Sequence, residues 1–273
     1  MAPSSDEIAR GWDEAVDGYE RYYVPRFAPW VETAVLPLAG ADLPDGPVLV
    51  PCCGTFPELA ALASAVPHRE VTGIDLSGGM VARARDRAGL HPGARVEQGD
   101  ASTLEPRWSG ACAAVVSVFG LQQLPDPAGA LASWAGALRP GGLVSVAYWP
   151  RSTEDDGPFA LLAEVLTEAL GGPAPHGPTW EDDVVPALRR QGLDVVSDQL
   201  VRHAIEHPDA ATCFEAHVRS GPLRPLVTAR GEAFVGDLRA RVLARAPAAG
   251  WSHRPAARHV LAHRPQPAPA LSG

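Results

Sequence analysis

Two short apolar runs, joined by a tight loop and a helix-length segment, constrain the fold of this chain most strongly. Residues 48–50 read Val-Leu-Val and lead into the loop Pro51-Cys52-Cys53-Gly54. Residues 71–74 form the second run, which ends at Asp75. Short runs without alternation are typical of strands that are buried on both faces of a parallel sheet. The segment therefore predicts a strand–helix–strand unit.

The same pattern continues along the chain. Further strand-like runs occupy residues 95–99, 113–119 and 143–148. The predicted helices between the strands span residues 57–66, 79–88 and 127–138. Strands that alternate with helices imply right-handed crossovers, so we expect an α/β fold with a Rossmann-like, doubly wound sheet.

The flanking segments predict a helical cap and a lid. Residues 6–38 have an amphipathic helical pattern within an expected N-terminal cap, residues 1–45. The main domain is expected to span residues 46–264, with lid segments near 155–180 and 207–250 and a flexible tail at 265–273. Within it the pattern predicts helices at 158–170, 181–191, 209–219 and 231–246, and strands at 193–203 and 258–263.

Composition narrows the class of partner. The net charge is −9 and no basic run stands out, which argues against a nucleic-acid partner. The four cysteines lack Cys-x-x-Cys spacing, so neither a zinc site nor a disulfide framework is expected. The first residues lack the features of a signal peptide, and no apolar run reaches membrane-spanning length. We expect a cytoplasmic monomer or homodimer that does not contact a membrane.

The order of these elements resembles that of class I S-adenosyl-L-methionine (SAM)-dependent methyltransferases. In that family a seven-stranded sheet ends in an antiparallel hairpin, which here would pair residues 193–203 with 258–263. Arg139-Pro140-Gly141-Gly142 matches the turn before the fifth strand. The segments 19–25, 221–224 and 253–255 resemble a bacterial small-molecule branch of natural-product type.

The loop after the first strand favours a nucleoside without a pyrophosphate. It does not follow Gly-x-Gly-x-x-Gly, the fingerprint of dinucleotide sites. Aligned with the family's first motif, Val50 takes the acidic position, and Cys52, Gly54 and Phe56 take the three glycine positions. Only Gly54 is retained, and Phe56 is expected to add bulk where the ligand tail approaches. SAM is the cofactor that the resemblance implies.

Two further features of the loop are expected to serve that cofactor. Thr55 and Glu58 form a potential capping box for the following helix. The free N–H groups of that helix would then face the carboxylate of the methionyl end.

The resemblance also implies individual cofactor contacts. Asp75 would accept hydrogen bonds from the ribose hydroxyls, and Asp100 would meet the adenine amino group. Met80 can equally be a core residue, and Asp100 an acid in a surface turn. The expected cofactor-binding residues are Tyr22, Pro51, Cys52, Gly54, Thr55, Asp75, Leu76, Met80, Asp100, Ala101, Ser117 and Phe119.

The expected reaction is methyl transfer to a small apolar or aromatic metabolite, in natural-product biosynthesis. Tyr19, Tyr23 and His217 are the candidate catalytic residues, because they lie in the cap and the lid. Further histidines, at 176, 203 and 207, are weaker candidates for a base. Cys52 and Cys53 lack a cationic neighbour in the sequence and are interpreted as small loop residues.

Two other functions stay open. The altered glycine loop allows a protein that binds SAM without methylating. Asp75 would also suit an NAD(P)-dependent oxidoreductase, although the missing phosphate-loop glycines count against one.

Overall fold

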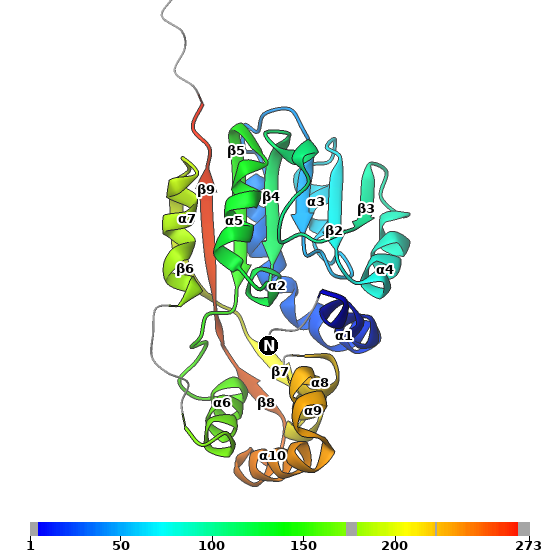
Figure 1. Ribbon diagram of the computed structural model, residues 1–273, viewed down its shortest axis with the longest axis vertical. Helices are drawn as coiled ribbons and strands as arrows, with labels where there is room; N and C mark the ends of the chain where they lie inside the picture. The colour runs from blue at the N-terminus through cyan, green and yellow to red at the C-terminus, as the bar shows by residue number, and fades with distance from the viewer. Residues whose placement is uncertain (1–4, 173–178, 222, 267–273) are drawn as a thin grey trace, which may run out of the picture.

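A seven-stranded sheet forms the centre of the computed structural model, which describes residues 5–172, 179–221 and 223–266. The strand order is β3-β2-β1-β4-β5-β9-β6, with β9 antiparallel to both of its neighbours (Figure 1). The strands are β1 (Val48–Pro51), β2 (Val71–Asp75), β3 (Ala94–Gln98), β4 (Cys112–Val118), β5 (Leu138–Tyr148), β6 (Asp194–Arg202) and β9 (Ala256–His263). The predicted doubly wound sheet with a terminal antiparallel pair is confirmed. Residues 267–273 of the predicted tail, and His176, lie outside the described residues.

The two faces of the sheet follow from the alternation of side chains along β1. Val48 and Val50 are buried on the face covered by α2 and α3, whereas Leu49 is buried on the face covered by α5 and α7. The covering helices are α2 (Val24–Val35), α3 (Leu59–Ala65), α4 (Gly78–Ala88), α5 (Pro127–Gly136) and α7 (Val184–Arg190). Burial on both faces explains why the strands read as unbroken apolar runs.

Strand β5 begins earlier than the sequence pattern predicts. It starts at Leu138, and the Arg-Pro-Gly-Gly segment lies within it as an irregularity where the pairing with β4 shifts register. Gly141 has φ 83°, in the left-handed region that favours glycine.

The N-terminal segment forms one helical run with a widened turn in its middle. Helix α1 (Ser5–Gly18) continues through a π-helical stretch, Tyr19–Tyr23, into α2, and a short 3₁₀ turn, Leu36–Leu38, ends the run. The N–H of Val24 donates to the carbonyl of Tyr19, five residues earlier. Pro25 has no N–H to donate and its ring crowds the preceding turn, which accounts for the wider turn at this point.

A second group of elements lies beyond the carboxyl ends of the parallel strands (Figure 1). It comprises α6 (Pro158–Ala169), α8 (Ala210–Ser220), α9 (Arg224–Arg230), α10 (Glu232–Arg245) and the antiparallel pair β7 (Ile205–His207) and β8 (Trp251–His253). Val165, Phe214 and Leu238 belong to a separate apolar core there. The sequence pattern does not predict α9, β7 and β8, because these elements span only seven, three and three residues. Within the described ranges, no helix is long and apolar enough to cross a membrane.

Candidate functional site

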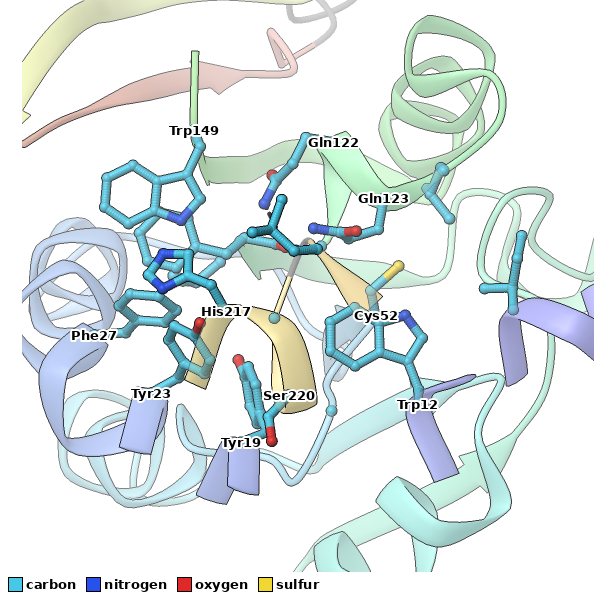
Figure 2. A pocket seen from close by; sticks show the side chains of 18 of the residues that line it. Trp12, Tyr19, Tyr23, Phe27, Cys52, Gln122, Gln123, Trp149, His217 and Ser220 are labelled. Atoms are coloured by element: carbon cyan, nitrogen blue, oxygen red, sulfur yellow. Dashed lines mark hydrogen bonds between the residues drawn. The ribbon is translucent and has the colours of Figure 1, made fainter. Parts of the chain in front are cut away.

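A cavity of about 500 Å³ lies between the carboxyl ends of the strands, the N-terminal helices and α6 and α8. Figure 2 shows Phe27, Tyr23, His217 and Trp149 gathered on one side of it, with Cys52 and Trp12 on the other. Of the predicted site residues, the lining contains Tyr19, Tyr23, Cys52, Gly54, Asp75, Leu76, Met80, Asp100, Ala101, Phe119 and His217. The sheet edge thus brings together residues that are far apart in the sequence.

The loop after β1 retains a glycine-like backbone although two of the glycine positions are substituted. Cys52, Gly54 and Phe56 have φ values of 56°, 53° and 62°, all in the left-handed region. The expectation that Phe56 would obstruct the ligand tail is wrong. Its side chain is fully buried in the core on the far side of the loop and does not line the cavity. The substitution therefore changes the core beneath the site rather than the space within it.

The predicted capping box between Thr55 and Glu58 does not form. Helix α3 begins at Leu59, later than expected, and its first turn has no side-chain cap. Thr55 Oγ1 and Glu58 Oε2 are both buried without a hydrogen-bond partner in the described part of the chain. Burial raises the pKa of Glu58 to about 8, while the Arg87 guanidinium opposes the rise.

Asp75 at the end of β2 holds the loop and still has room for a ligand. Its Oδ2 accepts from the N–H of Gly54 at 2.8 Å, and its Oδ1 accepts from the N–H of Ser77 at 3.0 Å. Burial raises the pKa of Asp75, and these backbone donors oppose the rise. A carboxylate offers about four acceptor sites, so acceptor capacity remains for the hydroxyls of a ribose.

The rest of the cavity lining near Asp75 is apolar, apart from the carboxylate of Asp100 at its edge. Met80 is 2% exposed and lines the cavity, so it serves as both a core residue and a wall residue. Leu76 and Ala101 lie in the same wall. Asp100 Oδ1 accepts from the N–H of Ser102 at 2.8 Å, and the exposed carboxylate keeps free acceptor capacity toward the cavity.

Four of the residues predicted to bind the cofactor lie outside the cavity lining. Ser117 Oγ donates to the carbonyl of Pro51 at 3.0 Å, which ties β4 to β1 beneath the site. Thr55 is fully buried below the loop. Tyr22 points away to β7, because the π-helical turn directs Tyr19 and Tyr23 toward the cavity and Tyr22 toward His207. Pro51, the last residue of β1, is the fourth. The structure therefore does not place these four side chains on the surface of the cavity, contrary to the prediction.

The three candidate catalytic residues all line the cavity, but their chemistry differs. Burial raises the pKa of Tyr19 and of Tyr23, so both phenols stay protonated. His217 Nδ1 lies 2.8 Å from the carbonyl oxygen of Cys213. A carbonyl only accepts, so Nδ1 carries the proton and Nε2 keeps a free lone pair. Burial lowers the pKa of His217, which keeps the ring neutral.

Aromatic side chains form the other end of the cavity. The rings of Phe119 and Trp149 are stacked with centroids 4.3 Å apart and an interplanar angle of 4°. Phe119 has φ 58°, and its ring also meets Phe27 edge-on at 4.7 Å. Phe159 on α6 packs between Trp149 and His217. The pairing of Trp149 with Phe119 depends on the sheet, because these residues directly follow β5 and β4.

Polar contacts hold α1 over the cavity. Asp13 Oδ1 accepts from Ser77 Oγ at 2.5 Å and from the N–H of Gly79 at 2.8 Å, at the start of α4. Glu20, in the π-helical stretch after α1, forms an ion pair with Arg87 of α4. A methyl group on Gly79 would lie 3.0 Å from Val16 Cγ2, so the glycine permits this close approach. Asp13 was missed because nothing in its local sequence distinguishes it from other surface acids.

Desolvation raises the pKa of both the half-buried Cys52 thiol and the buried Cys53 thiol. This agrees with their interpretation as loop residues, since a protonated thiol is a weak nucleophile. No group of three potential metal-ligating side chains suited to a metal ion occurs among the described residues.

Comparisons with known proteins agree with this geometry. Residues 48–142 match the family model of a methyltransferase domain. Over 160 residues the chain is 36% identical to trans-aconitate 2-methyltransferase of Deinococcus radiodurans, and this aligned stretch covers 57% of each protein. The chain thus spans less than two thirds of the length of this relative.

Two solved structures share the fold over most of the chain. The [4+2]-cyclase SpnF matches with a TM-score of 0.56 and 17% identity, over 97% of this chain and 98% of that one. A protein solved in a study of the conversion of a disulfide bond into a thioacetal group during echinomycin biosynthesis matches with a TM-score of 0.52 and 21% identity, over 86% and 82%. Residues 48–142 thus match a methyltransferase domain, and these two solved structures share the fold over most of the chain. The cofactor that this methyltransferase fold implies is SAM, and the free acceptor sites of Asp75 together with the cavity fit it.

Proposed function

We propose that the chain binds SAM and transfers its methyl group to a small, largely apolar or aromatic metabolite. The observation that carries the proposal is one cavity with two chemically different ends. Gly54, Asp75 and Asp100 lie at one end, and an aromatic wall lies at the other. A cavity of about 500 Å³ lies within the range of about 300–1,000 Å³ that is usual for small-ligand sites.

The acceptor end supports an apolar substrate. Phe27, Phe119 and Trp149 contribute ring faces and edges, and Leu162 and Leu166 of α6 extend the apolar surface. Apolar walls with few polar groups are typical of sites that orient a hydrophobic ligand. A natural-product intermediate has this character, and a structural neighbour comes from a study of echinomycin biosynthesis.

The residues of the chain would act mainly by orientation. SAM supplies an already activated methyl group when it is bound. Holding an acceptor in line with it can contribute roughly 7–11 kcal/mol through proximity alone. For a hydroxyl acceptor, the proton released as the new carbon–oxygen bond forms would move to His217 Nε2. A positioned base of this kind contributes about 10²–10⁴-fold. Tyr19 and Tyr23 would then close the cavity as protonated phenols.

Two measurements test the proposal. Calorimetry with S-adenosylhomocysteine asks whether the cofactor end binds, and incubation with methyl-labelled SAM and a panel of aromatic metabolites asks whether a methyl group is transferred. We expect binding and transfer to at least one small molecule. Transfer to RNA or protein alone would refute the substrate class, and absence of cofactor binding would refute the whole proposal.

A protein that binds SAM without methylating is the second candidate. Two of the three glycine positions are substituted, and a protein of the same fold is named as a [4+2]-cyclase. Binding of S-adenosylhomocysteine, without its formation from SAM across the whole panel, would favour this candidate.

A further inference from the structure

Four polar side chains from four separate segments form a continuous chain beside the aromatic end of the cavity. Tyr22 Oη lies 2.5 Å from His207 Nδ1, and His207 Nε2 lies 3.0 Å from His253 Nε2. His253 Nδ1 lies 2.6 Å from Glu154 Oε2, and these two side chains are 3% and 4% exposed. We call this set, Tyr22, His207, His253 and Glu154, the polar chain. It is not part of the cavity lining.

The donors and acceptors of the polar chain fit together in one direction when both imidazoles are neutral. A Glu154 carboxylate only accepts, so His253 Nδ1 carries a proton and His253 Nε2 has a lone pair. His207 must then donate from Nε2, which leaves its Nδ1 to accept from the Tyr22 hydroxyl. Every group between the phenol and the carboxylate is satisfied in this arrangement.

One added proton would reverse that direction. It would reside on His253 beside the Glu154 carboxylate, so His253 Nε2 would donate to His207. His207 would donate from Nδ1 to the Tyr22 oxygen, and the phenol would lose His207 as its acceptor. A proton on His207 itself is disfavoured, because burial, with the neighbouring His253, His217 and Arg26, lowers its pKa to about 3.

Glu154 connects the polar chain to the wall of the cavity. Its Oε1 accepts from the N–H of Phe159 at 2.7 Å and from that of Ala160 at 3.3 Å, in the first turn of α6. The Phe159 ring meets His253 edge-on at 4.8 Å and also lines the cavity. A side chain at Gly157, which has φ 114°, would lie 2.8 Å from Glu154 Oε1, so glycine allows the carboxylate to reach the helix. At the other end, Tyr22 precedes Tyr23 of the cavity wall.

Resting on the proposed function, we propose that the polar chain positions the α6 wall against the N-terminal helix, so that its protonation controls binding at the acceptor end but not at the cofactor end. Its members are positioning residues, because they act through Phe159 and Tyr23. The other titratable and charged groups that face the chain come from α2 and α8 and from the residue before α8. They are Arg26, whose guanidinium carbon lies 3.9 Å from the Tyr22 ring centre, and Cys213, His217 and Asp209.

Substitutions in the polar chain can distinguish a role in positioning the cavity wall from a role in the general stability of the protein. In Glu154→Gln the amide oxygen can still accept from α6, but the amide NH₂ then faces His253 and forces the reversed direction. We expect the affinity for N-phenyl-1-naphthylamine, a neutral aromatic probe, to fall about tenfold with S-adenosylhomocysteine present, as expected for one lost buried hydrogen bond. The Kd of S-adenosylhomocysteine should stay within about twofold.

Tyr22→Phe removes only the terminal donor and should lower probe affinity in the same way. Tyr148→Phe is the matched control, because the Tyr148 hydroxyl is also buried but has no hydrogen-bond partner in the described structure. Unchanged probe affinity in both Glu154→Gln and Tyr22→Phe, or an equal loss in the control, would overturn the proposal.

Imidazole ¹⁵N NMR tests the direction without any ligand. At pH 8 we expect the proton of His207 on Nε2 and that of His253 on Nδ1, with resonances assigned by His207→Gln and His253→Gln. As the pH falls, the proton of His207 should move from Nε2 to Nδ1, and Glu154→Gln should produce the same tautomer already at pH 8. In the wild type, a proton on Nδ1 of His207 at pH 8, or a tautomer that persists through that titration, would refute the polar chain. Failure to bind S-adenosylhomocysteine would instead refute the proposed function and leave the NMR result to decide this inference.

Discussion

Because the carboxyl group of Glu58 is buried, we expect the stability of the folded protein to depend strongly on pH. The side chain is 2% exposed beneath the loop after β1, and its Oε2 has no hydrogen-bond partner among the described residues. Burial raises its pKa from the ordinary value of 4.5 to about 8. We therefore expect Glu58→Gln, which keeps the shape and removes the ionisation, to stabilise the protein at neutral and basic pH.

The sign and the magnitude follow from the two pKa values. A carboxyl whose pKa is higher in the folded state stabilises the fold fully below its unfolded pKa, and this contribution is lost as the pH rises through the folded pKa. At pH 5 Glu58 keeps its proton in the folded state, whereas most unfolded chains have already lost it. At pH 8 about half of the folded molecules still carry the proton, and almost no unfolded chain does. At about 1.4 kcal/mol for each unit of pKa difference, the free energy of unfolding of Glu58→Gln should gain about 3 kcal/mol on the wild type over this interval.

Urea unfolding at pH 5, 6, 7 and 8 measures this difference directly, because effects of pH that are common to both proteins cancel. Glu70→Gln is a suitable control, since Glu70 is exposed and paired with Arg95 on the surface. Its difference from the wild type should change by less than about 1 kcal/mol. A constant difference between wild type and Glu58→Gln from pH 5 to pH 8 would refute the reasoning, as would a variant that is less stable at pH 8.

Three further predictions concern the cavity and its cover. Asp75→Ala should raise the Kd of S-adenosylhomocysteine at least about 100-fold by calorimetry, because it removes charged acceptors from the ribose side; an unchanged Kd would contradict that role. Gly18→Ala should lower the Tm, since a methyl group there would collide with Ser220 of α8, whereas Gly236→Ala in open space on α10 should raise stability by up to about 1 kcal/mol. His217→Gln should lower kcat for a hydroxyl acceptor about 10²–10⁴-fold and remove the acidic limb of the pH–rate profile, with cofactor affinity retained; a variant with full kcat would exclude His217 as the base.

The strands could be predicted because burial on both faces of the sheet leaves a visible pattern in the sequence. Val48, Leu49 and Val50 are all fully buried although they face opposite sides of the sheet, and a continuous apolar run is the direct sign of that condition. Asp75 and Asp100 were predictable for the same reason, since an acid at a strand end is carried to the ligand edge of a parallel sheet.

Contacts between distant segments could not be predicted in this way. Trp149 follows β5 and Phe119 follows β4, so their stacking depends on the register of two strands and on the left-handed φ of Phe119. His207 and His253 lie on β7 and β8, which are each three residues long and are not paired within one local hairpin. Elements this short give no periodic signal, so the polar chain becomes visible only in three dimensions.

The substituted glycine loop shows how packing replaces a local rule. Left-handed backbone at Cys52 and Phe56 costs roughly 1–2 kcal/mol per residue relative to glycine, so other parts of the structure must offset it. The needed space lies on neighbouring strands and turns. A methyl group on Gly120 would collide with Cys52 Cβ, and one on Gly73 would lie 3.0 Å from the Phe56 ring. Glycines thus lie at the positions that face the loop, and the N–H of Gly54 donates to Asp75 within it. The altered motif therefore is not by itself a reason to expect a lost cofactor site.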